Sequence, residues 1–104
     1  MATYLLAYTG GSTPESEEAQ QAAMAAWGAW FGELGDAVAD AGNPFGPSAT
    51  LASDGSVTGA GASRLTGYSV IKADSLDAAT VAAKNCPLLA SGGSVEVYET
   101  FDVM

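Results

Sequence analysis

The chain has 104 residues, enough for one modest hydrophobic core and too few for two. Hydrophobic residues make up 48% of it, which argues against a disordered polypeptide in spite of its 13 glycines. Twelve acidic residues against three basic ones give a formal charge of −9, so the chain repels phosphate backbones and anionic lipid surfaces. We therefore expect a single domain over residues 1–104, with no nucleic-acid partner and no membrane partner.

The cysteine content and the apolar pattern predict where in the cell the protein is located. The single cysteine, Cys86, cannot form an internal disulfide and suits a reducing environment. The first residues lack the basic region that precedes the apolar stretch of a signal peptide. No apolar run approaches the roughly 20 residues that a membrane span needs. These features predict a cytoplasmic protein.

The first quarter of the chain predicts a strand followed by a long helix. Thr3–Thr9 is a short aromatic and aliphatic run, typical of a buried strand. Thr13 fits the N-cap of a helix and Pro14 its first position. Large apolar residues then recur at steps of three and four, which predicts a helix ending near Ala41. Trp30 lies just off this apolar stripe, where it seals the edge of the core or forms one wall of a pocket. The stripe consists of Met24, Trp27, Phe31, Leu34 and Val38.

A hairpin is predicted after this helix. Residues 42–47 hold two glycines and two prolines, which cannot continue a helix. Ser48–Ser53 is a plausible second strand, and Asp54-Gly55 is a hairpin signal that leads into Ser56–Thr58. We expect this hairpin to be the centre of the fold.

A second strand, helix and strand follow the hairpin. Leu65–Ala73 is rich in β-branched and aromatic residues and predicts the third strand. Asp74 fits the N-cap of a short, alanine-rich helix that closes at Cys86-Pro87. Ser94–Phe101 alternates polar and apolar residues and predicts the last strand.

The order strand, helix, strand, strand, helix, strand predicts an α+β, ferredoxin-like βαββαβ fold. Such a fold has a four-stranded antiparallel sheet with two helices on one face. Its other face carries apolar residues that need a cover. A second copy of the chain is the simplest partner that could cover this face, so we expect a homodimer.

Three segments of the chain resemble the YCII-related family: TYLLAY, AAWGAWFGEL and LTGYSVIKADSLDAATVAAKNCPLLASGGSVEVYE. Together they span nearly the whole chain, and Leu65–Glu99 is the most specific part. The resemblance implies a fold similar to muconolactone isomerase and other dimeric α+β barrels, in which two ferredoxin-like sheets pack around one interior. None of the matching segments is a catalytic motif.

The sequence departs from the family in two ways. It contains no His, so the His–Asp pair proposed for one branch cannot be carried over. Gly55–Thr58 occupies the place of the D-G-P-F motif that marks another branch. Asp54 is a candidate remnant of that acidic turn, although an Asp-Gly pair also serves the geometry of a hairpin by itself.

The sequence offers six candidate ligand-binding residues and leaves catalytic residues unassigned. Arg64, the only arginine, follows a glycine-rich loop where it would meet an anionic ligand or pair with one of the acidic residues. Tyr8 and Tyr68 lie on strands, where aromatic rings line a cleft or belong to the core. Asn43 and Phe45 form a loop that would rim the same cleft. The full set is Arg64, Tyr68, Tyr8, Asp54, Asn43 and Phe45.

The chemistry available to these residues leaves three functions open. Without His or spaced carboxylates, the sequence predicts no metal, no nucleotide and no cofactor. The first hypothesis is a homodimer that binds a small organic molecule in the barrel cleft. The second is an isomerase- or lyase-like enzyme that uses Asp54 or a tyrosine for proton transfer, by analogy of fold. The third is a protein interaction module without a ligand.

Overall fold

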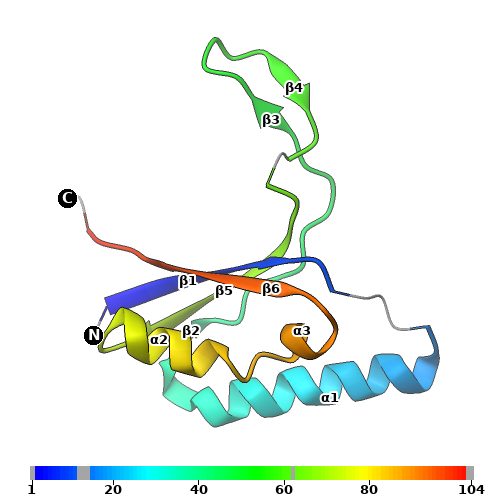
Figure 1. Cartoon of the computed structure of the whole chain (residues 1–104), viewed down its shortest axis with the longest axis vertical. Coiled ribbons are helices and arrows are strands. Elements are labelled where there is room, and N and C mark those ends of the chain that lie inside the picture. The colour runs from blue at the N-terminus through cyan, green and yellow to red at the C-terminus, as the bar shows by residue number, and fades with distance from the viewer. Residues whose placement is uncertain (1, 12–14, 62, 103–104) are drawn as a thin grey trace.

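The computed structural model describes residues 2–11, 15–61 and 63–102 (Figure 1). Its main sheet is antiparallel and has four strands in the order β2-β5-β1-β6. This order, with helices on one side, is the ferredoxin-like α+β arrangement, and the predicted fold class is confirmed. The elements are β1 Ala2–Thr9, α1 Glu17–Leu34, a 3₁₀ turn Gly35–Ala37, β2 Val38–Asp40, β3 Thr50–Leu51, β4 Val57–Gly59, β5 Leu65–Ala73, α2 Leu76–Ala83, α3 Pro87–Ala90 and β6 Ser94–Glu99.

Strand β1 lies inside the sheet and sets its register. It pairs with β5 on one side and β6 on the other, so that Leu5 lies opposite both Val70 and Tyr98. The helices α1, α2 and α3 all lie on one side of the sheet, and none of the described residues forms a helix on the opposite side (Figure 1). Alternate residues of each strand therefore face either the helices or the free side.

The start of α1 depends on a serine cap. Ser16 adopts an extended conformation and its Oγ accepts a hydrogen bond from the backbone N–H of Ala19 at 3.1 Å. Acidic side chains in the first turn suit the positive end of the helix dipole. The predicted cap at Thr13 and the predicted first position at Pro14 lie outside the described residues.

The end of α1 differs from the prediction. Gly35 has a φ of +54° and donates its backbone N–H to the carbonyl of Phe31, which stops the helix. After one 3₁₀ turn, Val38 begins the edge strand β2. The predicted continuation to Ala41 is therefore wrong, because pairing with β5 takes this segment into the sheet.

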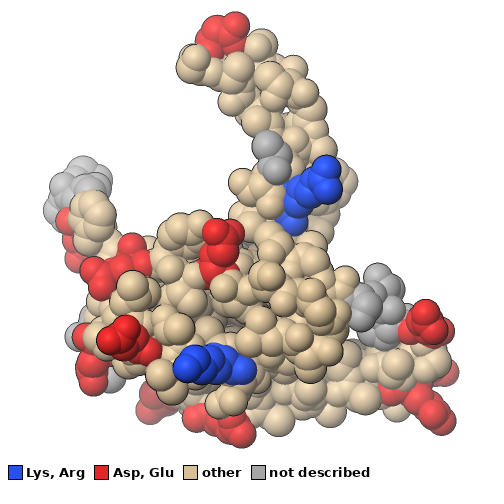
Figure 2. Space-filling view, viewed as in Figure 1, with Lys and Arg blue, Asp and Glu red and all other residues tan. Residues whose placement is uncertain are grey.

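The hairpin forms, but not at the centre of the fold. Strands β3 and β4 make a separate two-stranded sheet and are shorter than the predicted Ser48–Ser53 and Ser56–Thr58. We call residues 47–64 the arm. It projects from the main sheet on the side that carries no helix, and the space-filling view shows it curving beside a hollow above the body (Figures 1 and 2). The place expected for this hairpin in the main sheet is taken by β2.

The second half of the chain follows the prediction with small shifts. Ser75 rather than Asp74 caps α2, and its Oγ accepts a hydrogen bond from a backbone N–H of the first turn. Pro87 begins the short helix α3 instead of closing the segment. Strand β6 ends at Glu99, before the predicted Phe101.

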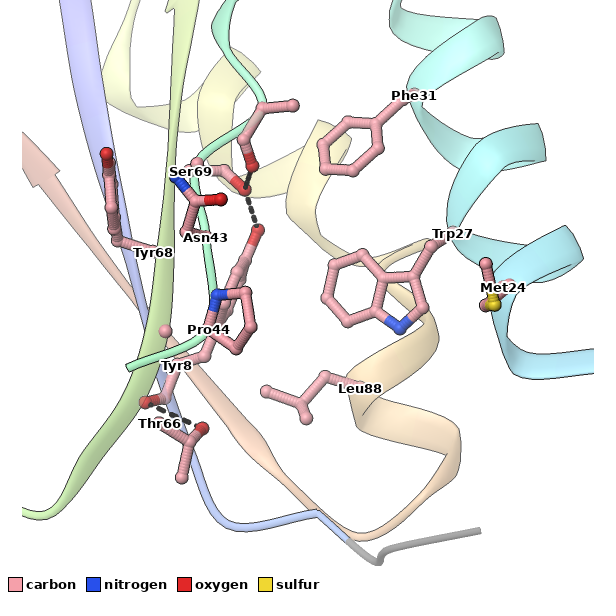
Figure 3. A pocket seen from close by; sticks show the side chains of 13 residues that line it. Tyr8, Met24, Trp27, Phe31, Asn43, Pro44, Thr66, Tyr68, Ser69 and Leu88 are labelled. Carbon is pink, nitrogen blue, oxygen red and sulfur yellow. Dashed lines mark hydrogen bonds between the residues drawn. The ribbon is translucent and has the colours of Figure 1, made fainter. Parts of the chain in front are cut away.

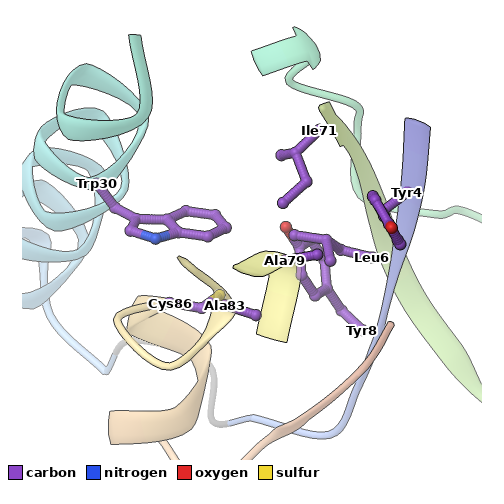
Figure 4. Packing of buried hydrophobic residues seen from close by; sticks show 8 residues of the cluster. All are labelled: Tyr4, Leu6, Tyr8, Trp30, Ile71, Ala79, Ala83 and Cys86. Carbon is purple, nitrogen blue, oxygen red and sulfur yellow. The ribbon is translucent and has the colours of Figure 1, made fainter. Parts of the chain in front are cut away.

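The core lies between the sheet and the helices (Figure 4). Trp30 is the buried residue of α1, with 3% of its surface exposed, and its indole N–H donates to the carbonyl of Ala82 at 3.1 Å. It therefore belongs to the centre of the core rather than its edge, whereas Met24 of the predicted stripe is 68% exposed. The buried cluster is Tyr4, Leu6, Tyr8, Trp30, Ile71, Ala79, Ala83 and Cys86.

Candidate functional site

A cavity of about 640 Å³ lies between α1 and the sheet (Figure 3). This volume is within the range of small-molecule pockets. Trp27 and Phe31 of α1 form one wall, and β1 and β5 form the other. None of the described residues that line the cavity is charged. They are Tyr8, Met24, Trp27, Phe31, Ala41, Gly42, Asn43, Pro44, Thr66, Gly67, Tyr68, Ser69 and Leu88.

The segment after β2 shapes the sheet wall because it runs along β5. The backbone N–H of Phe45 donates to the carbonyl of Thr66 at 2.9 Å, and that of Tyr68 donates to the carbonyl of Asn43 at 3.3 Å. Gly42 has a φ of +78°, and a Cβ at this position would overlap the carbonyl oxygen of Tyr68. Only glycine allows the two backbones to approach this closely.

A buried chain of hydrogen bonds connects the inner parts of the wall. The hydroxyl of Tyr8 donates to Oγ of Ser69 at 2.7 Å, and Oγ of Ser69 donates to the carbonyl of Ala41 at 2.7 Å. The direction of the chain is fixed, because a carbonyl oxygen only accepts. Tyr8 is 6% exposed and Ser69 is 0% exposed. These two hydrogen bonds thus connect β1, β5 and the segment after β2 at the cavity.

The electrostatic character of this wall is neutral. Burial raises the pKa of Tyr8 to about 12, and the hydrogen bond with Ser69 only partly opposes that rise. The phenol therefore stays protonated near neutral pH. A ligand in the cavity meets uncharged hydroxyl, amide and aromatic groups.

Aromatic rings give the cavity flat apolar surfaces. The ring of Trp27 lies edge-on to Tyr8, with centroids 5.3 Å apart and an interplanar angle of 67°. It also lies 5.9 Å from the ring of Phe31. Such surfaces suit a planar or largely apolar ligand.

Three of the six predicted site residues belong to the lining of this cavity, and Phe45 contacts one of them, Tyr68, from outside the lining. The side chains of Tyr8 and Asn43 line it (Figure 3). Tyr68 belongs to the lining, but its ring lies on the far side of β5 and points away from the cavity. There it stacks on Phe45, with centroids 5.7 Å apart and an interplanar angle of 17°.

The other two predicted residues lie on the arm. Arg64 has a φ of +55° at the base of the arm, where it lines a separate groove together with Phe45. Asp54 is in the exposed turn between β3 and β4, where hydrogen bonds from Ser56 lower the pKa of its carboxyl group. Neither side chain lines the cavity.

Sequence reasoning missed most of the cavity lining, including Trp27, Phe31 and Ser69. Trp27 and Phe31 were assigned to the core stripe of α1, although both are only half-buried. Ser69 carries the one detectable signal, because it is a polar residue at a strand position that faces the core. A buried hydroxyl needs partners, and here the partners belong to the cavity wall.

The described residues offer no clear centre for metal or thiol chemistry. Within residues 2–11, 15–61 and 63–102, no three His, Cys, Asp or Glu side chains gather as ligands for a metal ion. Cys86 is buried, and burial raises the pKa of its thiol, which disfavours the reactive thiolate. In the same part of the chain, the helices are too short or too polar to cross a membrane.

Comparison with protein families matches residues 1–103 to the YCII-related domain. The match includes all three segments on which the resemblance rests. No curated protein and no solved structure matches the chain.

Proposed function

Because the chain belongs to the YCII-related family and holds an apolar cavity, we propose that it binds a small, uncharged, largely apolar organic molecule between α1 and the sheet. The observation that carries this proposal is the lining itself. Its 13 residues include no charged side chain, and its aromatic and aliphatic members outnumber its polar ones. A few polar groups, among them Asn43 and Thr66, are available to orient the ligand.

Charge supports an uncharged ligand over an anionic one. An anion in this cavity would lose its water shell without gaining a cationic partner. Arg64 lies at the base of the arm and is absent from the lining. The net charge of −9 adds a general repulsion of anions.

Binding is better supported than proton-transfer chemistry. An isomerase- or lyase-like reaction near neutral pH needs a group whose pKa lies close to that pH. The pKa of Tyr8 is about 12, and Asp54 is exposed on the arm with a lowered pKa. The presence of a cavity of ligand size also supports small-molecule binding over a ligand-free interaction module.

The proposal includes a homodimer in the cytoplasm. The side of the sheet without helices carries apolar residues such as Leu5 and Val70, and the resemblance to dimeric α+β barrels favours a second copy as their cover. The single thiol of Cys86 suits a reducing compartment.

Two fluorescent probes that differ by one sulfonate group test the ligand class. N-phenyl-1-naphthylamine is neutral, and 8-anilino-1-naphthalenesulfonate is its anionic analogue. We expect saturable fluorescence enhancement with the neutral probe and a dissociation constant about tenfold higher for the anion, a difference of about 1.4 kcal/mol. Equal affinities, or no saturable binding of the neutral probe, would contradict the proposal.

A matched pair of variants locates the binding site. Met24→Glu adds a carboxylate to the lining at a residue that is 68% exposed, so the fold tolerates it. Val81→Glu adds the same charge to α2 at a residue that is 60% exposed and outside the lining. Met24→Glu should raise the dissociation constant of the neutral probe about fivefold, whereas Val81→Glu should leave it unchanged. An equal effect of both variants would place the probe elsewhere.

A further inference from the structure

The hydroxyl groups of the cavity wall use their protons within the protein. The hydroxyl of Tyr8 donates to Oγ of Ser69, which donates to the carbonyl of Ala41, both at 2.7 Å. Oγ1 of Thr66 donates to the backbone carbonyl of Tyr8 at 3.2 Å. A hydroxyl group has a single proton, so once that proton is donated its oxygen can only accept. Toward a ligand, these three oxygens are therefore acceptors.

The other side-chain donors of the described lining are directed elsewhere or exposed to water. The six-membered ring of Trp27 lies toward the Tyr8 hydroxyl, with the indole nitrogen on the opposite side of the ring (Figure 3). The hydroxyl of Tyr68 donates to Oδ2 of Asp40 at 3.4 Å, on the far side of β5. Asn43 is exposed, so a ligand contact with its amide only replaces a contact with water. The inner part of the cavity is thus poor in donors.

The phenol oxygen of Tyr8 has acceptor capacity that the fold does not use. This hydroxyl is directed toward the space in front of Trp27 and Phe31 (Figure 3). Within residues 2–11, 15–61 and 63–102, no group donates to it. Tyr8 is only 6% exposed, so a ligand that fills the cavity separates this oxygen from water. A ligand without a donor would leave the acceptor unpaired, which weakens its binding.

Aromatic rings beside this acceptor define the shape of the ligand. The rings of Trp27 and Phe31 lie 5.9 Å apart with an interplanar angle of 36°, and the ring of Trp27 lies 5.3 Å from that of Tyr8. A planar aromatic molecule packs well on such surfaces. The polar hydrogen of a phenol, an indole or an aryl amine lies at the edge of the ring, from which it can reach the phenol oxygen.

We propose that the ligand of this cavity is an aromatic hydrogen-bond donor, a neutral phenol, indole or aryl amine whose O–H or N–H donates to the phenol oxygen of Tyr8. This inference rests on the proposed function and narrows its ligand class to molecules that carry a donor. Ser69 sets the preference, because it accepts the Tyr8 proton and passes its own to the carbonyl of Ala41.

An isosteric pair of competitors tests the need for a donor. Indole carries an N–H where benzofuran carries an oxygen acceptor, and the two molecules have nearly the same shape. Each is titrated against N-phenyl-1-naphthylamine bound to the full chain, and displacement is read from the emission of the probe. We expect the inhibition constant of indole to be about tenfold lower than that of benzofuran, although benzofuran is the more apolar molecule.

Removing the acceptor should remove the preference. Tyr8→Phe keeps the ring in the cavity wall but has no phenol oxygen, so the inhibition constants of indole and benzofuran should agree within about twofold. Tyr98→Phe makes the same change on β6, at a residue that is 50% exposed and outside the lining, and should keep the tenfold preference. Circular dichroism checks that both variants fold.

Redirecting the proton should remove the preference by a different route. Ser69→Ala takes away the acceptor of the Tyr8 hydroxyl, so the phenol becomes able to donate to a ligand. In this variant, benzofuran should bind at least as tightly as indole. A purely structural role of Ser69 would weaken both compounds by the same factor and leave their ratio unchanged.

The outcomes separate this inference from the proposed function. No saturable binding of N-phenyl-1-naphthylamine overturns both. Saturable binding of the probe with equal inhibition constants for indole and benzofuran in the wild type overturns this inference alone. A tenfold preference for indole that persists in Tyr8→Phe or in Ser69→Ala also overturns it, because the donor of the ligand then meets an acceptor other than Tyr8.

Discussion

Replacing Ser69 by alanine should destabilise the protein far more than the loss of one exposed hydroxyl. Ser69 is fully buried and stands between Tyr8 and the carbonyl of Ala41. Ser69→Ala leaves the buried O–H of Tyr8 without an acceptor and removes the donor to the carbonyl of Ala41, a residue that is itself exposed. A buried hydroxyl left without an acceptor costs about 1–3 kcal/mol, whereas water can replace the donor to the carbonyl of the exposed Ala41, so we expect a loss of about 1–3 kcal/mol in the free energy of unfolding. The total free energy of unfolding of a domain of this size is only about 5–15 kcal/mol.

A double-mutant cycle separates this effect from packing. Tyr8→Phe alone leaves Ser69 bonded to Ala41 and should cost about 0.5–1.5 kcal/mol. In Tyr8→Phe/Ser69→Ala the orphaned phenol is gone, so the double variant should lose about 1 kcal/mol less than the sum of the single variants. Ser63→Ala, at an exposed serine, is the control and should change stability by less than about 0.5 kcal/mol.

Urea denaturation monitored by tryptophan fluorescence measures all four free energies. The protein concentration must be the same for each variant, because the proposed homodimer would make the apparent stability concentration-dependent. Equal m values would show that the variants unfold from comparable states. If the costs of Tyr8→Phe and Ser69→Ala add within about 0.3 kcal/mol, the two hydroxyls act independently and the hydrogen-bond chain is not a unit.

Three further predictions concern other contacts of the fold. Because the pKa of Tyr8 is raised from 10 to about 12 in the folded protein, its contribution to stability is complete below pH 10 and is lost between about pH 10 and 12. The free energy of unfolding of the wild type should therefore fall by about 2–3 kcal/mol more than that of Tyr8→Phe across this pH range, as measured by urea denaturation. Gly42→Ala should lower the free energy of unfolding by more than about 2 kcal/mol in urea denaturation, because the added Cβ overlaps the carbonyl of Tyr68. Gly55→Ala is the control: Gly55 has a φ of +90° and open space around it, so only backbone strain of about 1–2 kcal/mol is expected. Trp30→Phe keeps an aromatic ring in the core but removes the N–H that donates to the carbonyl of Ala82 in α2. Thermal unfolding should therefore show a loss of about 0.5–1.5 kcal/mol in the free energy of unfolding, and no change would mean that this hydrogen bond is energetically neutral.

Long elements with a regular pattern were predictable from local sequence. Strand β5 was predicted with its observed bounds, Leu65–Ala73, because four of its nine residues carry β-branched or aromatic side chains: Thr66, Tyr68, Val70 and Ile71. The alternation in Ser94–Glu99 also located β6 within two residues. In both cases the residues that specify the element lie within it.

The end of α1 was not predictable from the same signals. Val38 continues the helical spacing of apolar residues, yet it begins β2. A strand of three residues has too little length for a period of two to be recognised. Its formation depends on pairing with β5, opposite Ile71, which is a long-range contact that periodicity does not encode.

The hairpin shows the same separation between local and long-range information. Asp54-Gly55 forms a turn as predicted, with Gly55 at a φ of +90°. Its position outside the main sheet depends on which strand pairs with β5, and β2 makes that pairing instead. The prediction of a central hairpin therefore failed at the level of topology rather than of the turn.

The cavity was only partly predictable for a related reason. Tyr8 and Asn43 were named from strand and loop positions, and both line the cavity. Trp27 and Ser69 complete the walls from elements that are far apart in the sequence. A half-buried aromatic residue on a helix has the same sequence pattern whether it fills a core or lines a cavity.

The most direct test of the proposed function is chemical-shift mapping of ¹⁵N-labelled protein titrated with N-phenyl-1-naphthylamine. Binding between α1 and the sheet predicts saturable shifts in the amide signals of Gly42, Gly67 and Ser69, with Asp54 on the arm unaffected. Shifts confined to Leu51 on the arm and Tyr98 on β6, or no saturable shifts at all, would contradict the proposal that this cavity is the ligand site.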